Sequence, residues 1–154
     1  ASTINTTATT VGSAVVYTPS SNWTAVSTGV TNYLADKIPV GTTVTVLPPA
    51  YVPAYVGINI VVGSSYSQNS VKLAVYNAML GTSGTFSYTN NTFGATVALS
   101  SVISAIQGIA GINSVTITQL NTDNSTTVAT LSFAANQIPY LLATNLVISA
   151  TGGL

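Results

Sequence analysis

The fold is decided by the stretch Ala54-Tyr-Val-Gly-Ile-Asn-Ile-Val-Val62, which is short, rich in β-branched residues and free of charge. Its apolar side chains Val56, Ile58 and Ile60 occupy alternate positions. Successive side chains of a strand point to opposite faces of a sheet, so this alternation predicts a strand with one buried face. We expect the strand to lie near the centre of a sheet.

A helix is predicted directly after this strand. Residues 64–70 are polar, and Val71, Val75 and Met79 then place one apolar side chain on each helical turn. Gly81 follows, which is a residue type that commonly ends helices. The strand and the helix are therefore expected to form one structural unit.

Two further helices are predicted from apolar residues at helical spacing. The first covers residues 23–35, with Ser21 or Asn22 placed to cap its free amides. The second covers about residues 99–109 and has the clearest amphipathic stripe in the chain. Three helices are expected in all.

The other β-branched segments predict strands, bounded by proline and polar turn residues. Residues 81–94 are expected to form loop and turn, and the last third of the chain is expected to be mainly strand. Besides the central strand, the predicted strands are residues 14–17, 43–47, 115–118, 128–133 and 146–149.

This order of elements predicts an α+β fold of two small lobes, in which helices pack on antiparallel or mixed sheets. Residues 1–13 are low in large apolar side chains and are expected to form a flexible arm. Residues 14–52 are expected to form a strand–helix–strand lobe, and residues 53–154 a C-terminal α+β domain. The hydrophobic content of 47% is enough for a core.

The charged inventory of the chain is only Asp36, Lys37, Lys72 and Asp123, or 3% of the residues, against about a quarter in typical proteins. The sequence has no His, Cys, Glu or Arg, which are the usual sources of imidazole bases, thiol nucleophiles and metal ligands. We therefore expect no enzymatic activity, no catalytic residue, no metal site, no cofactor and no small-molecule substrate.

Two classes of partner are also disfavoured. Two lysines cannot neutralise the phosphates from which nucleic-acid binding gains most of its affinity, so we expect no nucleic acid. Polar residues interrupt the apolar stretches within about a dozen residues, short of the roughly 20 that cross a bilayer. We expect no membrane span.

The charged residues give little support for a catalytic or metal-binding role. Lys72 follows Ser70 by two positions, and such positions do not face each other on a helix, so a solvated lysine is preferred to a nucleophile pair. Asp36 and Lys37 are interpreted as an exposed ion pair at a helix end. Asp123 offers calcium a single carboxylate, so we prefer a polar hairpin turn there.

Four aromatic residues lie near proline turns and suit either of two roles. They would line a carbohydrate or partner surface, or they would pack as corners of the fold, which we prefer. They are Trp23, Tyr51, Tyr55 and Tyr140.

The order of several segments carries a family resemblance. A Val-rich strand is expected to lead through prolines into the next strand at Val44-Thr-Val-Leu-Pro-Pro-Ala-Tyr-Val-Pro-Ala-Tyr-Val56. A helix with a proline-glycine exit precedes it at Val30-Thr-Asn-Tyr-Leu-Ala-Asp-Lys-Ile-Pro-Val-Gly41. Residues 14–154 thereby resemble the C-terminal part of phage baseplate J-like proteins. Further matching segments are Val15-Val-Tyr17, Phe93-Gly94, Ser101-Val102, Ile106, Ile109-Ala-Gly-Ile-Asn-Ser-Val115 and Ile138-Pro-Tyr-Leu141.

The resemblance implies a wedge subunit of a phage tail baseplate or a related contractile injection machine. Such a subunit is a structural component, with other baseplate and tail subunits and copies of itself in a multimeric ring as partners. It would be made in the host cytoplasm and located in the virion. The family has no catalytic residues to carry over. Its members are longer and carry more charge, so we expect this chain to be a C-terminal part or a shortened homologue.

A secreted cell-surface or filament subunit is the alternative. Ala1 would then be a mature start, residues 1–12 would pair with a neighbouring sheet as a donated strand, and Asn-x-Ser/Thr sequons would carry glycans on the extracellular surface. The order of motifs favours the baseplate interpretation over this one. The four sequons begin at Asn5, Asn22, Asn90 and Asn124.

Overall fold

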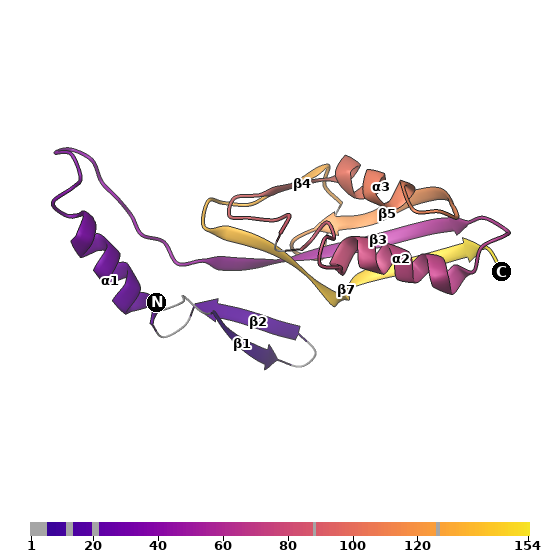
Figure 1. The fold of residues 1–154 in the computed structure, drawn as a ribbon, viewed down its shortest axis with the longest axis horizontal. Coiled ribbons are helices and arrows are strands. Elements are labelled where there is room, and N and C mark those ends of the chain that lie inside the picture. The colour runs from indigo at the N-terminus through magenta and orange to yellow at the C-terminus, as the bar shows by residue number, and fades with distance from the viewer. Residues whose placement is uncertain (1–5, 12–13, 20–21, 88, 126) are drawn as a thin grey trace. The chain divides into compact units, whose positions relative to one another are not determined.

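The computed structural model describes residues 6–11, 14–19, 22–87, 89–125 and 127–154 (Figure 1). It divides into two units, Ala1–Tyr51 and Val52–Leu154. Three helices and antiparallel or mixed sheets make up the described elements, so the α+β fold predicted from the sequence is confirmed.

The second unit is built on a three-stranded sheet with β3 (Ala50–Val62) in the middle. Strand β5 (Ile112–Asn121) pairs antiparallel with one side of β3. Strand β7 (Gln137–Gly152) lies on the other side, and its arrow points in the same direction as that of β3 (Figure 1). The sheet is therefore mixed, and the strand expected near its centre lies there.

Two helices pack against this sheet. Helix α2 (Gln68–Leu80) contacts β7, and α3 (Leu99–Gln107) contacts β5. A two-stranded sheet of β4 (Thr96–Ala98) and β6 (Thr130–Ser132) accompanies them. The helices therefore cover one face of the mixed sheet.

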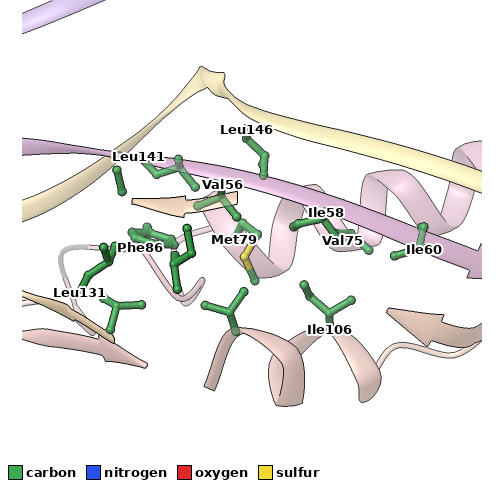
Figure 2. Close-up of a cluster of buried hydrophobic side chains, with 14 of the residues drawn as sticks. Val56, Ile58, Ile60, Val75, Met79, Phe86, Ile106, Leu131, Leu141 and Leu146 are labelled. Atoms are coloured by element: carbon green, nitrogen blue, oxygen red, sulfur yellow. The ribbon is translucent and has the colours of Figure 1, made fainter. Parts of the chain in front are cut away.

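The core forms between β3 and the two helices (Figure 2). Val56, Ile58 and Ile60 of β3 are each at most 1% exposed, as the period-two pattern predicted. Burying such a side chain contributes about 1.5–3 kcal/mol. The helices supply Val71, Val75, Met79, Val102 and Ile106, and the surrounding segments supply Phe86, Leu120, Leu131, Leu141 and Leu146.

Glycine in the middle of β3 accompanies a bulge in the sheet. Gly57 pairs with Gln119 while the next residue, Ile58, pairs with Ile117, so Thr118 is the extra residue on β5. A Cβ at Gly57 would lie 2.5 Å from Oγ1 of Thr118. A side chain at this position would therefore collide with the bulge.

The first unit has a hairpin, one helix and an irregular segment. Strands β1 (Thr6–Val11) and β2 (Ala14–Pro19) pair antiparallel over six residue pairs. Helix α1 (Trp23–Leu34) follows, and none of its side chains is buried. Residues 35–49 contain neither helix nor strand.

The strand predicted at residues 43–47 is wrong. An alternating Val/Thr segment forms a strand only where a neighbour accepts its hydrogen bonds and covers its apolar face. Val44 and Leu47 instead remain 44% and 54% exposed, and no described strand lies beside them. Residues 14–52, predicted as a strand–helix–strand lobe, contain β2 (Ala14–Pro19), a helix at Trp23–Leu34 and an irregular segment that lasts until β3 begins at Ala50.

Other expectations for the first unit also need correction. Residues 6–11, which were expected to belong to a flexible arm, form β1 because β2 lies next to them and accepts their pairing. Asn22 occupies the N-cap position of α1 without a side-chain hydrogen bond to the helix. Ser21, the other proposed cap, lies outside the described residues, as do residues 1–5 and 12–13.

In the second unit, β7 is much longer than the predicted segment 146–149 and runs through Pro139. Proline is tolerated there because β7 lies at the edge of the sheet. Strand β4 was not predicted, because its three residues are too few to show a periodic pattern.

Ile106 lies in the core and is 0% exposed, so shortening its side chain is expected to destabilise the protein strongly. We expect Ile106→Ala to lower the free energy of unfolding by about 2–5 kcal/mol, from lost burial and the cavity left behind. Urea unfolding followed by circular dichroism measures this change. Leu73→Ala, at a position 60% exposed on α2, is the control and is expected to change stability by at most about 0.5 kcal/mol. Equal effects would contradict the placement of the core.

Candidate interaction surface

The charged residues of the first unit form one local, exposed cluster. Nζ of Lys37 lies 3.1 Å from Oδ1 of Asp36 and 4.4 Å from the ring centroid of Tyr33. Both charged side chains are largely exposed, at 48% and 76%, so the pair contributes little stability. The structure therefore shows the exposed ion pair that was predicted.

Asp123 lies in the polar turn that follows β5. Its Oδ1 accepts hydrogen bonds from the backbone N–H of Ser125, at 3.1 Å, and from the Ser125 hydroxyl. Both bonds stabilise the ionised carboxylate and so lower the pKa of Asp123 below its ordinary value. The bond from the Ser125 hydroxyl has the larger effect. Asn124 has a positive φ of 61°, and its Oδ1 accepts a bond from Nε2 of Gln119. The predicted polar turn is present.

The remaining sequence candidates do not come together as a reactive group. Lys72 lies half-buried on α2, and Ser70 two positions earlier is exposed. Among the residues that the structure describes, no three carboxylate, thiol or imidazole side chains are grouped as metal ligands would be.

The four aromatic candidates divide between the two units. Trp23 begins α1 and Tyr51 lies at the start of β3, both in the first unit, whereas Tyr55 of β3 and Tyr140 of the neighbouring strand β7 belong to the second. Each of them is half-buried. Partial burial fits packing positions along the strands and the helix.

Sequence reasoning missed Asn121, at the end of β5. Its residue is 2% exposed, and its side-chain Oδ1 and Nδ2 have no hydrogen-bond partner among the described residues. It borders a hollow of about 320 Å³ that Asp123 and Ser125 also line. Both polar atoms of the Asn121 side chain are inaccessible to solvent. The hollow therefore gives access to Asp123 and Ser125 in the turn but not to the Asn121 amide. An asparagine after a strand predicts only a turn, and no sequence signal marks its burial.

Within the second unit, no described helix or strand covers the face of the mixed sheet opposite the helices. We call the six outward-pointing residues of its three strands the open sheet face. They surround a hollow of about 290 Å³. They are Ser114 and Thr116 of β5, Asn59 and Val61 of β3, and Ser149 and Thr151 of β7.

The pairing register explains this arrangement. Asn59 pairs with Thr116, and Val61 pairs with Ser114. These pairs alternate with the pair of Ile60, which is buried, and Val115, which is partly buried, so they point away from the helices. A single residue shift of β5 would exchange the two faces, and the hydrophobic pattern prevents it.

The chemistry of the open sheet face is uniform. It contains hydroxyl groups, one amide and a valine, and none of its residues is charged. Val61 is 42% exposed, and Val147, two positions before Ser149 on β7, is 56% exposed. Interface cores are depleted of charge, so such a surface suits contact with protein better than contact with a charged ligand.

The first unit also leaves apolar side chains uncovered. Val30 and Tyr33 of α1 are 38% and 66% exposed. A helix that buries none of its residues gains little from packing, and most helical stability in proteins comes from packing. Helix α1 therefore presents an apolar stripe that its own unit does not cover.

The fold and its surface define a small α+β protein whose mixed sheet has one helix-covered and one open face. No protein-family model matches the chain, and no curated protein matches it. Within the described ranges, every helix is too short and too polar to span a bilayer.

The unpaired amide of Asn121 predicts an unusual mutational effect. Burying an unsatisfied polar group costs about 1–3 kcal/mol, so we expect Asn121→Leu to leave the free energy of unfolding unchanged or to raise it. The matched control is Asn91→Leu. Asn91 is 5% exposed, and its Nδ2 donates to the carbonyl oxygens of Thr85 and Ser87, so its loss should cost about 1–3 kcal/mol. Urea unfolding of both variants tests the contrast, and equal destabilisation would refute it.

The turn at Asp123 predicts a low pKa that depends on Ser125. The chain has two aspartates, so a ¹³C NMR titration of their carboxyl groups can follow each one. We expect Asp123 to titrate below its ordinary range, and Ser125→Ala to bring the pKa back toward it because the strongest hydrogen bond is lost. A lowered folded-state pKa means that the turn is stabilised above the ordinary range and loosens as pH falls through the lowered value. An unchanged pKa in the variant would contradict this cause.

Proposed function

We propose that this protein is a structural assembly subunit, a wedge component of a phage tail baseplate or a related contractile injection machine. The observation that carries the proposal is the open sheet face, which leaves a three-stranded surface uncovered and uncharged. Its role is to hold neighbouring subunits through protein–protein contacts rather than to catalyse a reaction.

The scarcity of charge supports an assembly role. Only Lys72 and Asp123 are charged in the second unit, and neither lies on the mixed sheet. A soluble protein that works alone commonly carries charge over its whole surface and uses it to resist association. A subunit enclosed by partners gains from its absence, because each buried charge would cost desolvation energy.

The first unit also supports an assembly role, because its helix and its irregular segment bury little of their own surface. Helix α1 buries no side chain, and residues 35–49 are irregular and mostly exposed. A segment without a core gains its stabilising burial from a partner. Val30 and Tyr33 supply apolar area for such a contact.

The family resemblance supports the choice of assembly. The Val44–Val56 segment leads from the irregular segment directly into β3. In the segment of baseplate J-like proteins that it resembles, a Val-rich strand leads through prolines into the next strand, and this chain has the second of these strands, β3. The partners proposed on this basis are other baseplate and tail subunits and further copies of the chain in a ring, within the virion.

A secreted surface subunit is the competing proposal, and one sequon favours it. Asn124 is exposed in the turn after β5, where a glycan would meet no obstacle from its own turn. Asn90 is different, because its Nδ2 donates to the carbonyl oxygens of Ser83, at 3.0 Å, and Gly84, at 2.9 Å. A glycan on Asn90 would replace one of the two Nδ2 hydrogens and so remove at least one of these bonds, which makes Asn22 and Asn124 the more informative sequons.

Mass spectrometry of the native material separates the two proposals. We expect the protein to be recovered from purified phage or injection particles, in the tail fraction, with unmodified peptides that contain Asn22 and Asn124. The peptide with Asn90 is the internal control, because the structure disfavours a glycan there under either proposal. Recovery from a cell surface with glycan mass at Asn124 would replace the baseplate proposal with the secreted one.

A further inference from the structure

We infer that the free edge of β7 is a docking site for the β1–β2 hairpin of a second copy of this chain. The inference rests on the proposed assembly role and names one of its contacts. It combines three observations: a long sheet edge with few protective features, a hairpin that pairs with no third strand among the described residues, and a connecting segment of 15 residues without helix or strand.

Strand β7 is an edge strand of unusual length. It has 16 residues, which span about 50 Å at roughly 3.3 Å per residue, and among the described strands only β3 pairs with it. Near the two ends of β7 the carbonyl of Gln137 accepts a bond from the backbone N–H of Gly94, and that of Gly152 accepts one from Nε2 of Gln68. Between them, residues 141–151 present a row of backbone N–H and C=O groups on the outer side of the strand. Natural proteins protect such edges with charged residues, prolines, bulges or short strands.

The outer edge of β7 has little of this protection. Residues 137–152 contain no charged residue, and their single proline, Pro139, lies near the start of the strand. The other edge of the sheet differs at the end of β5, where the segment after the β5 turn bonds to it. Oγ1 of Thr127 donates to the carbonyl of Thr118, and the backbone N–H of Val128 donates to that of Leu120, both at 2.9 Å. This contrast selects β7 as the edge that accepts a partner.

The β1–β2 hairpin is a suitable occupant. It pairs with no third strand among the described residues, and a two-stranded hairpin alone is at best marginally stable in water. Neither strand contains a charged residue, so no repulsion opposes its approach to β7. Addition of the hairpin to an existing sheet would satisfy backbone groups on both partners.

The connection between the units permits this exchange. Residues 35–49 contain no helix or strand, and 15 residues in extended form span up to about 50 Å. Exchange of an identical element between copies is a low-cost route to association. When each copy donates its hairpin to the next copy, the contacts are head-to-tail. Such contacts form a ring when the rotation between neighbouring copies closes on itself.

Disulfide trapping between two single-cysteine chains tests this contact. The native sequence contains no cysteine, so Thr9→Cys in β1 and Val147→Cys in β7 each introduce a unique thiol into the full chain. One chain is labelled with ¹⁵N so that mass distinguishes mixed from homotypic dimers. We expect a mixed disulfide between the two variants on air oxidation at high protein concentration.

Thr116→Cys is the matched control, because Thr116 is exposed on the same open sheet face but belongs to β5. Thr9→Cys should form no mixed dimer with it. Equal trapping at Thr116 and Val147 would indicate contact with the whole face, and trapping at neither would indicate a free edge. Dominant homotypic dimers of Val147→Cys would indicate pairing of two β7 strands. Each of these three results overturns the inference.

Hydrogen exchange of the unmodified chain gives a second, independent measurement. We expect amides in residues 6–11 and 141–151 to exchange more slowly together as protein concentration rises. Slowing that is independent of concentration would mean that the hairpin pairs within its own chain, and it would overturn the exchange between copies. The proposed baseplate role survives that result, because location in the native particle decides it.

Discussion

The structure depends on the burial of one face of β3. Val56, Ile58 and Ile60 project between α2 and α3, where they meet Val75 and Ile106 with almost no exposure. Each side chain removes apolar area from water, which stabilises the second unit together with the other buried residues of the core. The antiparallel register with β5 follows from this burial, since a shift by one residue would place the apolar set in solvent.

The same constraint creates the surface on which the functional argument depends. Because side chains of a strand alternate, burial of one face leaves Asn59 and Val61 on the other. In a protein with typical charge this second face would carry Lys and Glu. Here it carries hydroxyl groups, an amide and valine, so it remains compatible with burial by another subunit. The scarcity of charge thus links the composition of the chain to an assembly role.

Much of the second unit was predictable, because its apolar residues repeat with clear periods. The pattern of Val71, Val75 and Met79 predicted α2, and these three side chains are its buried ones. The segment 43–47 has an equally clear alternation but forms no strand, since it lacks a partner that would bury Val44. The local pattern of apolar residues predicts which face of a segment would be buried. Whether that face is buried depends on the presence of a second surface that packs against it.

The sequence by itself determined the class of fold, the central strand, the three helices and the restriction to four charged side chains, because these follow from local periodicity and composition. The tertiary structure decided which edges and faces of the sheet stay open. It also decided that Asn121 is buried without a partner while Asn91 is buried with two hydrogen bonds. These properties depend on contacts between residues far apart in the chain, so no local pattern encodes them.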